Sequence, residues 1–234
     1  MQNIKSNLAA LERRIENACT AAGRERSSVT LIGVSKTKPQ AAVREACALG
    51  VAHFGENYLD EAITKITATA DLELTWHFVG RVQSNKTRDI ATHFHWVHTV
   101  DREKIARRLN DQCPPDKRLN VLLQINIDAD PAKGGVSPQQ APGLLQYLCT
   151  LPQVVPRGLM TILATDSDPR ASYESMAQLF TSLAQQLDPQ ALPHWDTLSM
   201  GMTGDLEQAV AAGATHIRIG TALFGAREVR TEQP

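Results

Sequence analysis

The stretch TLIGVSKTKP, residues 30–39, is an apolar run that ends on Lys36 and is closed by a proline. Its apolar part is typical of a strand that is covered on both faces, as strands are in parallel sheets. A segment with helical periodicity follows at residues 39–49. Because parallel neighbours need a crossover connection, this order predicts one β/α unit.

The same unit recurs along the whole chain. We expect strands at residues 29–35, 51–56, 75–80, 95–100, 120–126, 154–162, 196–200 and 215–220. Helical patterns lie between them at 39–49, 57–67, 84–92, 101–112, 137–150, 170–187 and 204–212, and an amphipathic helix precedes them at 4–22. Eight alternating units predict an α/β fold, a (β/α)8 TIM barrel, with a doubly wound open sheet as the alternative. We expect one domain over residues 1–234, with the N-terminal helix of residues 1–23 packed on it.

The composition narrows the function classes. With 234 residues, 42% hydrophobic and 21% charged, the chain is typical of a globular protein, and its net charge of −1 argues against a nucleic-acid binder. The four cysteines form no CxxC pair, which argues against structural zinc and fits reduced thiols in the cytosol. The N-terminus has no signal-peptide pattern and no apolar run has transmembrane length. We therefore expect a cytoplasmic protein without metal, membrane or nucleic-acid partners.

The last two strands end in residues that suit an anion. Loops after strands seven and eight of such barrels commonly bind phosphate, often at the start of a short helix. Hydroxyls and backbone N–H groups are offered there by Ser199, Met202 and Thr203 in LSMGMTGD, and by Gly220 and Thr221 in RIGTALFG. Ordinary helix capping would select the same residue types, so that interpretation stays open.

Arg218 lies in THIRIG, where Ile217 and Ile219 alternate with His216 and Arg218. Alternation with a period of two sends the isoleucines to the helix-covered face, and His216 and Arg218 into the barrel. An unpaired buried charge is very costly, so Arg218 needs an acceptor. A carboxylate or a ligand atom would serve.

Lys36 ends an internal strand, where we expect burial and the nearby Lys38 to lower its pKa. A neutral amine forms Schiff bases with carbonyl compounds. An amine, a phosphate site and an arginine at one barrel mouth suit pyridoxal phosphate: its aldehyde at Lys36, its phosphate at the last two loops and its pyridine nitrogen at Arg218. Two alternatives remain open, a plain surface lysine and a cofactor-free Schiff-base aldolase.

Longer motifs resemble the pyridoxal phosphate homeostasis protein family, whose barrel is similar to the N-terminal domain of alanine racemase. The matching stretches, from about residue 30 to 227, are LIGVSKTKP, HFGENYLDEA, WHFVGRVQSNK, HTVDREKIARRLN, KGGV, GLMTI and LSMGMTGDLEQAVAAGATHIRIGTALFGAR. The resemblance implies that Lys36 forms the Schiff base, that Ser199 and the Gly220–Thr221 pair bind phosphate, and that Arg218 faces the pyridine nitrogen. It also places Asn57 at the cofactor mouth, and it leaves His77 and Asn85 with a role in the site or only in the fold.

The resemblance further implies a carrier or buffer of pyridoxal phosphate in vitamin B6 and amino-acid homeostasis, without established catalysis. The residues agree, because a cationic partner leaves the ring nitrogen unprotonated and weakens the ring as an electron sink. A racemase also needs acid–base groups on both faces of the substrate Cα. Of the three tyrosines only Tyr58 lies near a predicted strand end. Weak amino-acid racemase activity, or another pyridoxal-phosphate reaction, is the alternative, and a scaffolding barrel is a more distant one.

Three expectations concern partners and loops. Apo pyridoxal-phosphate enzymes are candidate recipients of the cofactor. A monomer is expected, because the chain ends seven residues after Arg227, before any counterpart of the second domain of alanine racemase. Lys133, in the polar loop at 128–138, is a candidate secondary docking amine on a mobile segment, with a solvated loop lysine as the alternative.

Overall fold

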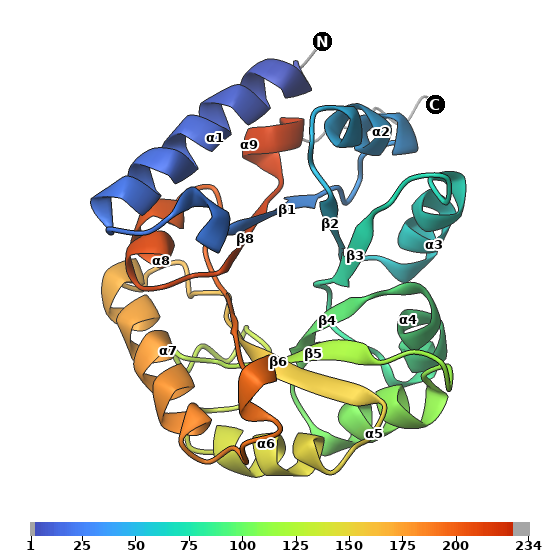
Figure 1. The fold of residues 1–234 in the computed structure, drawn as a ribbon, viewed down its shortest axis with the longest axis vertical. Coiled ribbons are helices and arrows are strands. Elements are labelled where there is room, and N and C mark those ends of the chain that lie inside the picture. Colours follow the sequence, from blue (N-terminus) through green and yellow to red (C-terminus); the bar gives the residue numbers. More distant parts are fainter. Residues whose placement is uncertain (1–2, 227–234) are drawn as a thin grey trace.

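The strands form one closed parallel barrel in a computed structural model that describes residues 3–226 (Figure 1). Each strand pairs with its neighbour in sequence, and the last pairs with the first. This closure confirms the predicted barrel and excludes the open sheet. The strands are β1 (Thr30–Val34), β2 (His53–Glu56), β3 (Thr75–Phe78), β4 (Trp96–Val100), β5 (Leu119–Gln124), β6 (Val154–Met160), β7 (Thr197–Ser199) and β8 (His216–Ile219).

Helices surround the barrel, as Figure 1 shows. Those of the described chain are α1 (Ile4–Ala21), α2 (Gln40–Ala48), α3 (Leu59–Ala68), α4 (Thr87–His93), α5 (Glu103–Gln112), α6 (Ala141–Cys149), α7 (Pro169–Ala184), α8 (Leu206–Ala211) and α9 (Thr221–Phe224). The expected helices are all present within a few residues of their predicted bounds. The sequence did not predict α9, because a single turn is too short to show a hydrophobic period.

Helix α1 lies across the last part of the barrel, against α8 and α9 (Figure 1). Its first turn is capped by Asn3, whose side chain accepts from the Ser6 N–H at 3.1 Å. The Asn7 amide donates to the Leu223 carbonyl at 3.0 Å, and Arg14 donates to the Thr203 carbonyl at 3.0 Å. The helix therefore braces both loops at which we expect phosphate. Residues 1–2 of the predicted N-terminal segment lie outside the described residues.

The pairing of β8 with β1 fixes which side chains face inward. Ile32 is the register partner of Arg218, and Thr30 is the partner of His216. The Arg218 guanidinium bonds to other residues inside the barrel, and the His216 ring lies 5.4 Å from that of Trp96. This confirms the predicted inward placement of Arg218 and His216.

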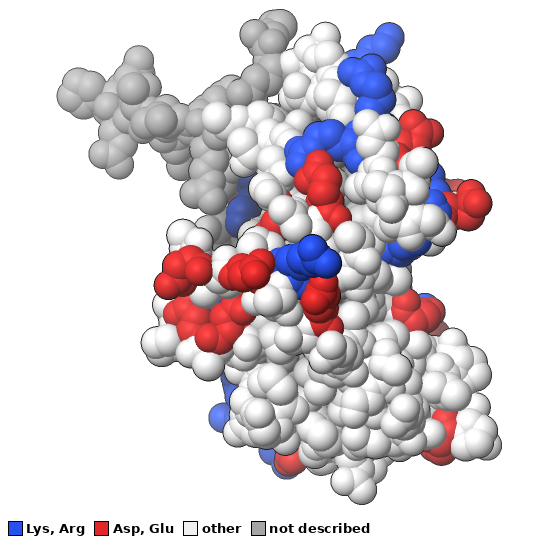
Figure 2. Space-filling model, turned by 90° about the vertical axis from the view of Figure 1, so that its left-hand side faces the viewer, with Lys and Arg blue, Asp and Glu red and all other residues white. Residues whose placement is uncertain are grey.

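The outer surface carries charges of both signs. In the upper half of the face shown in Figure 2, basic and acidic side chains lie near one another, whereas most of the lower half carries no charge. Within residues 3–226 no helix combines the length and the apolar character needed to cross a membrane. The four cysteines, Cys19, Cys47, Cys113 and Cys149, are free thiols.

Candidate functional site

Lys36 and the end of β8 lie at the same mouth of the barrel. Lys36 is partly buried and lies two residues after the end of β1. A Cβ placed on Gly220 would lie 3.4 Å from the carbonyl oxygen of Val34, so the last residue of β1 lies beside the segment that follows β8. Asn57 follows β2 at the same end. The mouth thus collects Lys36, Asn57, Gly220 and Thr221, as predicted from the strand ends.

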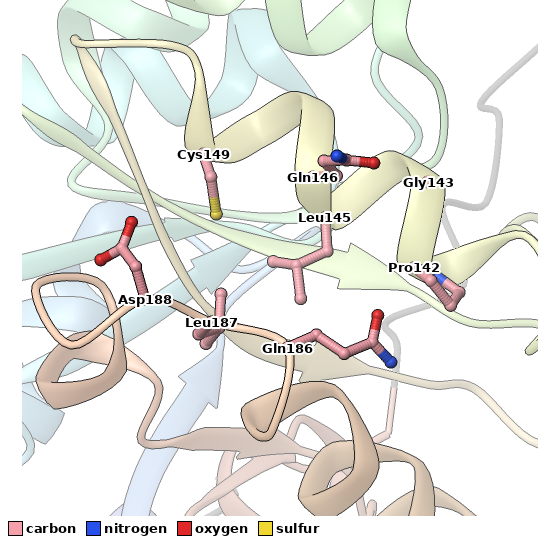
Figure 3. Close-up of a pocket in the computed structure, with 8 residues that line it drawn as sticks. All are labelled: Pro142, Gly143, Leu145, Gln146, Cys149, Gln186, Leu187 and Asp188. Atoms are coloured by element: carbon pink, nitrogen blue, oxygen red, sulfur yellow. The ribbon is translucent and has the colours of Figure 1, made fainter.

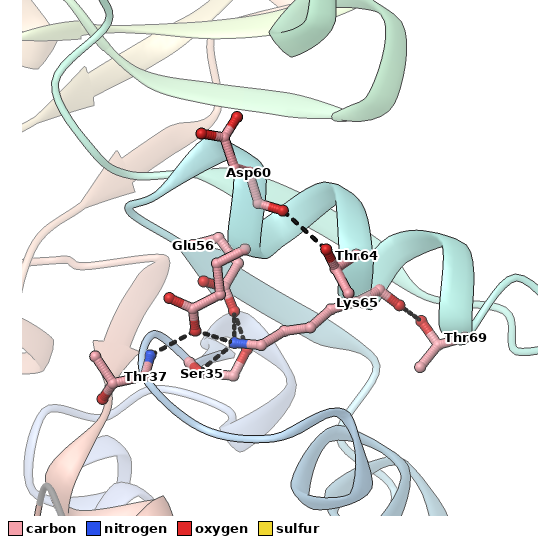
Figure 4. Close-up of polar contacts among 8 residues, drawn as sticks. Ser35, Thr37, Glu56, Asp60, Thr64, Lys65 and Thr69 are labelled. Atoms are coloured by element: carbon pink, nitrogen blue, oxygen red, sulfur yellow. Dashed lines mark hydrogen bonds and ion pairs between the residues drawn. The ribbon is translucent and has the colours of Figure 1, made fainter. Parts of the chain in front are cut away.

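Helix α3 holds the backbone on both sides of Lys36 (Figure 4). The Lys65 ammonium donates to the Ser35 carbonyl at 2.6 Å, and the Thr37 N–H donates to a Glu61 carboxylate oxygen at 2.6 Å. Thr37 has a φ of 65°, in the left-handed region that β-branched residues rarely adopt. The two hydrogen bonds stabilise this strained turn and so fix the direction in which the chain presents Lys36.

A buried ion cluster supplies these hydrogen bonds. Lys65 pairs with Glu56 at 2.7 Å and with Glu61 at 2.6 Å, and the Ser35 hydroxyl donates to Glu56 at 2.5 Å. Lys65 is 3% exposed and Glu56 is fully buried. Burial raises the pKa of Glu56, while Lys65 and Ser35 act in the opposite direction. The second carboxylate oxygen of Glu56 has no hydrogen-bond partner within the described chain. We call Ser35, Glu56, Glu61 and Lys65 the α3 cluster.

Arg218 is a buried cation with neutral partners. Its side chain donates to the Ser199 hydroxyl oxygen at 2.8 Å and to the Thr161 carbonyl at 2.7 Å, and the residue is 5% exposed. No carboxylate of residues 3–226 forms an ion pair with it. Burial lowers its pKa, whereas Tyr173 and Asp205 oppose that effect from nearby. A guanidinium has five N–H groups, so donors remain for a ligand.

The loop after β7 is closed by its own side chains. The Met202 N–H donates to Asp205 at 2.6 Å, and Thr203 is braced by α1 through its carbonyl. Ser199 is fully buried, with its hydroxyl between Arg218 and His98. The predicted phosphate residues therefore share this end of the barrel, but the Met202 N–H and the Ser199 hydroxyl already have partners inside the protein.

Several residues of this region were missed by sequence reasoning. His53, His77 and His98 form a hydrogen-bonded row inside the barrel. All three lie in the quoted motifs, but the resemblance suggests a role for His77 alone. Tyr173 of α7 is 1% exposed beside Asp205, and burial raises the pKa of its hydroxyl. The inward position of His98 could be predicted from the alternation of side chains in WVHTV, the sequence of β4. No sequence pattern around Tyr173 predicts its burial, because α7 has a mixed composition.

Gly80 allows the loops after β2 and β3 to meet. A Cβ at this position would lie 2.2 Å from the Asn57 carbonyl oxygen, which is far inside van der Waals contact. Beside this contact is a hollow of about 380 Å³ that Asn57, Tyr58, Arg81 and Lys86 help to line. The position of Asn57 at the barrel mouth thus depends on position 80 being a glycine, which has no side chain.

We expect Gly80→Ala to lower the free energy of unfolding by roughly 1–3 kcal/mol, because the Asn57 backbone must move to make room. The matched control is Gly143→Ala in α6, where an added Cβ has no neighbour within 4 Å. This control should be neutral or stabilising by up to about 1 kcal/mol, since alanine favours helix. Urea unfolding of both variants measures the difference. Equal effects would contradict the proposed contact.

The loop after β5 is more ordered than expected. The Asn126 amide donates to the Asp130 carbonyl at 2.8 Å, and the Gln124 amide donates to the Gly134 carbonyl at 2.9 Å. Val136 also bridges to Ile125. Lys133 is partly buried in this loop, and its predicted role as a docking amine stays a prediction.

A second hollow lies away from the barrel mouth. A hollow of about 380 Å³ between α6 and the segment after α7 is lined by Leu145, Cys149, Leu187 and Asp188, among others (Figure 3). None of the residues that line it belongs to the barrel mouth. Across residues 3–226, no group of three or more His, Cys, Asp or Glu side chains is arranged to hold a metal ion.

Comparison with known proteins decides the family. The chain is 50% identical to the pyridoxal phosphate homeostasis protein of Pseudomonas aeruginosa, over 97% of each chain. It is 45% identical to the protein of that name from Escherichia coli K12, over 97% of this chain and 98% of the relative. The chain belongs to the pyridoxal phosphate homeostasis protein family. The alanine racemase N-terminal domain matches residues 6–228, which confirms the resemblance found in the motifs.

Solved structures agree with this family assignment. PipY of Synechococcus elongatus, solved without PLP, is 39% identical, with a TM-score of 0.84 over 95% of this chain and 100% of that chain. The same protein with PLP bound gives a TM-score of 0.80 at 38% identity, with the same coverage of both chains. Alanine racemase of Corynebacterium glutamicum is 16% identical, with a TM-score of 0.66 over 97% of this chain and 63% of that one, and shows the likeness of fold.

Proposed function

We propose that this protein binds pyridoxal 5'-phosphate through Lys36 and serves intracellular vitamin B6 and amino-acid homeostasis as a cofactor carrier or buffer. Membership of the homeostasis protein family supports this role, as does the PLP-bound state of PipY, its relative of known structure. The four free cysteines fit a reducing cytoplasm. We further propose that the protein acts as a monomer and supplies apo-enzymes that use the cofactor.

The burial and hydrogen bonding of Arg218 are the main support for this proposal. A buried guanidinium without a carboxylate partner is costly unless something else accepts from it, and the two acceptors that it has among residues 3–226 leave donors unused. Pyridoxal phosphate has a ring nitrogen that accepts hydrogen bonds and a phosphate that is anionic. The residues therefore fit this cofactor: Arg218 would hold the ring nitrogen, while Thr203, Gly220 and Thr221 would hold the phosphate.

Lys36 would bind the other end of the cofactor, which supplies an aldehyde that reacts reversibly with amines and a ring that withdraws electrons. The α3 cluster fixes the backbone around Lys36, so the amine is presented from a rigid turn. Ser199 would act through Arg218, because its hydroxyl oxygen accepts from that guanidinium. Asn57 would line the entrance between the β2 and β3 loops.

The arrangement favours holding the cofactor over using it. Arg218 is cationic, so it would leave the ring nitrogen unprotonated and weaken the ring as an electron sink. Proton exchange at a substrate Cα also needs groups on both of its faces. Tyr58 is 54% exposed at the rim, and Tyr173 is buried with a raised pKa. Neither tyrosine is set up as a base opposite Lys36.

The test is the visible absorbance spectrum of the protein after addition of pyridoxal phosphate. We expect a yellow band in the wild type that is lost in Lys36→Ala, because Lys36 brings a partly buried amine to the barrel mouth just after β1. Lys38→Ala is the matched control, since its ammonium donates to the Ala226 carbonyl at 2.7 Å instead, and it should keep the band.

Four outcomes would contradict the proposal. A colourless wild type, or a band that survives in Lys36→Ala, would remove Lys36 as the binding amine. Borohydride trapping with sugar phosphates in the absence of cofactor would indicate an aldolase. Substrate-dependent loss of Cα deuterium at useful rates would indicate a racemase. Light scattering after size exclusion tests the monomer.

A further inference from the structure

Three imidazoles inside the barrel, those of His53, His77 and His98, form a chain of hydrogen bonds that ends on Arg218. His53 Nδ1 lies 3.0 Å from His77 Nε2, and His77 Nδ1 lies 2.9 Å from His98 Nε2. His98 Nδ1 then lies 2.9 Å from the Ser199 hydroxyl, to which Arg218 donates. The chain runs from the first residue of β2, at the opposite end of the barrel, to the arginine of the mouth.

Arg218 fixes the direction of every hydrogen bond in this chain. A guanidinium only donates, so the Ser199 oxygen must accept from it and the Ser199 hydrogen must go elsewhere. Within the described chain His98 Nδ1 is the other partner of this hydroxyl, so it accepts that hydrogen and His98 carries its own proton on Nε2. The same logic places a proton on Nε2 of His77, which donates to His53 Nδ1. All these donors point away from Arg218.

The surroundings keep these rings neutral. His77 and His98 are fully buried. Burial, together with the nearby His216 and Arg218, holds the pKa of His98 well below its usual range, and burial and the neighbouring histidines do the same for His77. A neutral imidazole has one donor and one acceptor, which is what each link of the chain requires.

We propose that His98 and His77 are positioning residues for Arg218, and that they keep the Ser199 hydroxyl oxygen turned toward the guanidinium as an acceptor. If His98 carried its proton on Nδ1, it would donate into the same oxygen as Arg218 and leave the Ser199 hydrogen without an acceptor in the chain. The ordered chain removes that competition and locks the rotation of the guanidinium. Its benefit to the cofactor rests on the proposed function, but the order of the protons does not.

Two variants of His98 separate the links. Asparagine can place its amide oxygen where Nδ1 lies, so His98→Asn keeps an acceptor for Ser199 and loses the bond to His77. Glutamine can place its amide nitrogen where Nε2 lies, so His98→Gln keeps the donor to His77 and leaves Ser199 without its acceptor. Both remove the ring and leave a similar cavity, so each controls for the packing defect of the other.

Nitrogen NMR of the cofactor-free protein reads the chain directly. We expect His77 and His98 as Nε2–H tautomers in the wild type, and separate Nη signals for a guanidinium of Arg218 that does not rotate freely. The separation should persist in His98→Asn and collapse in His98→Gln. Spectrophotometric titration should show pyridoxal phosphate binding roughly fivefold weaker in His98→Gln and near wild type in His98→Asn.

Each outcome decides between the claims. An Nδ1–H tautomer at His98, or equal behaviour of the two variants, would overturn the positioning role. The expected tautomers and Arg218 signals in a wild type that binds no pyridoxal phosphate would support the ordered chain and refute the proposed function. Normal cofactor binding together with a freely rotating Arg218 would support the proposed function and refute the ordered chain.

Discussion

Lys65→Met will lower the free energy of unfolding by about 3–5 kcal/mol, because it leaves a buried carboxylate without its cation. Glu56 is fully buried, and Lys65 is the only one of its hydrogen-bond partners in the described chain that carries a charge. The variant also loses the hydrogen bond to the Ser35 carbonyl, which holds the strand end next to Lys36. Guanidinium unfolding at pH 7 measures the change.

The loss should depend on pH in a predictable direction. Burial already raises the pKa of Glu56 above its unfolded value, and removal of Lys65 raises it further. The folded variant then binds a proton that the unfolded chain releases, so the deficit relative to wild type shrinks as the pH falls. A deficit that stays constant between pH 8 and pH 5 would argue that the cluster acts through packing alone.

Lys86→Met is the matched control, because Lys86 forms an exposed ion pair with Asp60 at 3.1 Å on the same side of the barrel. Exposed pairs contribute about 0–1 kcal/mol, so this variant should unfold almost as the wild type does. Adding Glu56→Gln to Lys65→Met should restore part of the lost stability, since no charge is then left unpaired. Equal losses in Lys65→Met and Lys86→Met would contradict the importance of burial.

Acid should destabilise the protein steeply, beginning just below pH 6.5. Burial lowers the pKa of His216 to about 4, and it holds those of His77 and His98 well below their usual range. The unfolded chain therefore takes up protons first, and stability present above pH 6.5 is lost as the pH falls toward the folded values. For His216 alone, the difference between 6.5 and about 4 corresponds to about 3 kcal/mol.

His216→Asn isolates this contribution. At pH 8 every imidazole is neutral in the unfolded chain, so the variant reports the lost packing against Trp96 and the neighbouring rings, together with any change in the 3.0 Å hydrogen bond between His216 and the Thr215 hydroxyl. Between pH 8 and pH 5 the variant should lose about 2 kcal/mol less stability than the wild type. Urea unfolding at the two pH values gives the comparison. Parallel losses in both proteins would show that His216 does not titrate on unfolding in this range.

The fold could be predicted because it is written in local patterns. Each strand is a short apolar run and each helix has its own period, so the eight units were visible without knowledge of their contacts. The inward direction of Arg218 followed from alternation within β8 alone. The short helix α9 could not be predicted this way, because its one turn forms through the Gly220 carbonyl, which accepts from the Phe224 N–H at 2.8 Å.

The candidate site could be predicted only where chemistry follows directly from a strand end. Lys36 and Gly220 could be predicted in this way, because each lies at the end of a strand. The residues that fix the backbone around Lys36 could not. Lys65 and Glu61 are spaced four apart on a helix, as in an ordinary exposed pair, and only the closure of α3 over β1 and β2 buries the lysine. The histidine row is spread over three strands, so each member looks like an isolated residue until the barrel closes.

Because the barrel closes only when β8 has been made, we expect the protein to become able to bind the cofactor only at the end of its synthesis. Lys36 leaves the ribosome early, whereas its neighbours on β8 are made close to the end, and the bond between Asn7 and Leu223 joins residues 216 positions apart. A chain that stops before β8 contains Lys36 but not Arg218. We therefore expect nascent and truncated chains not to bind the cofactor. The amount of cofactor bound in the cell would then depend only on the number of completed molecules.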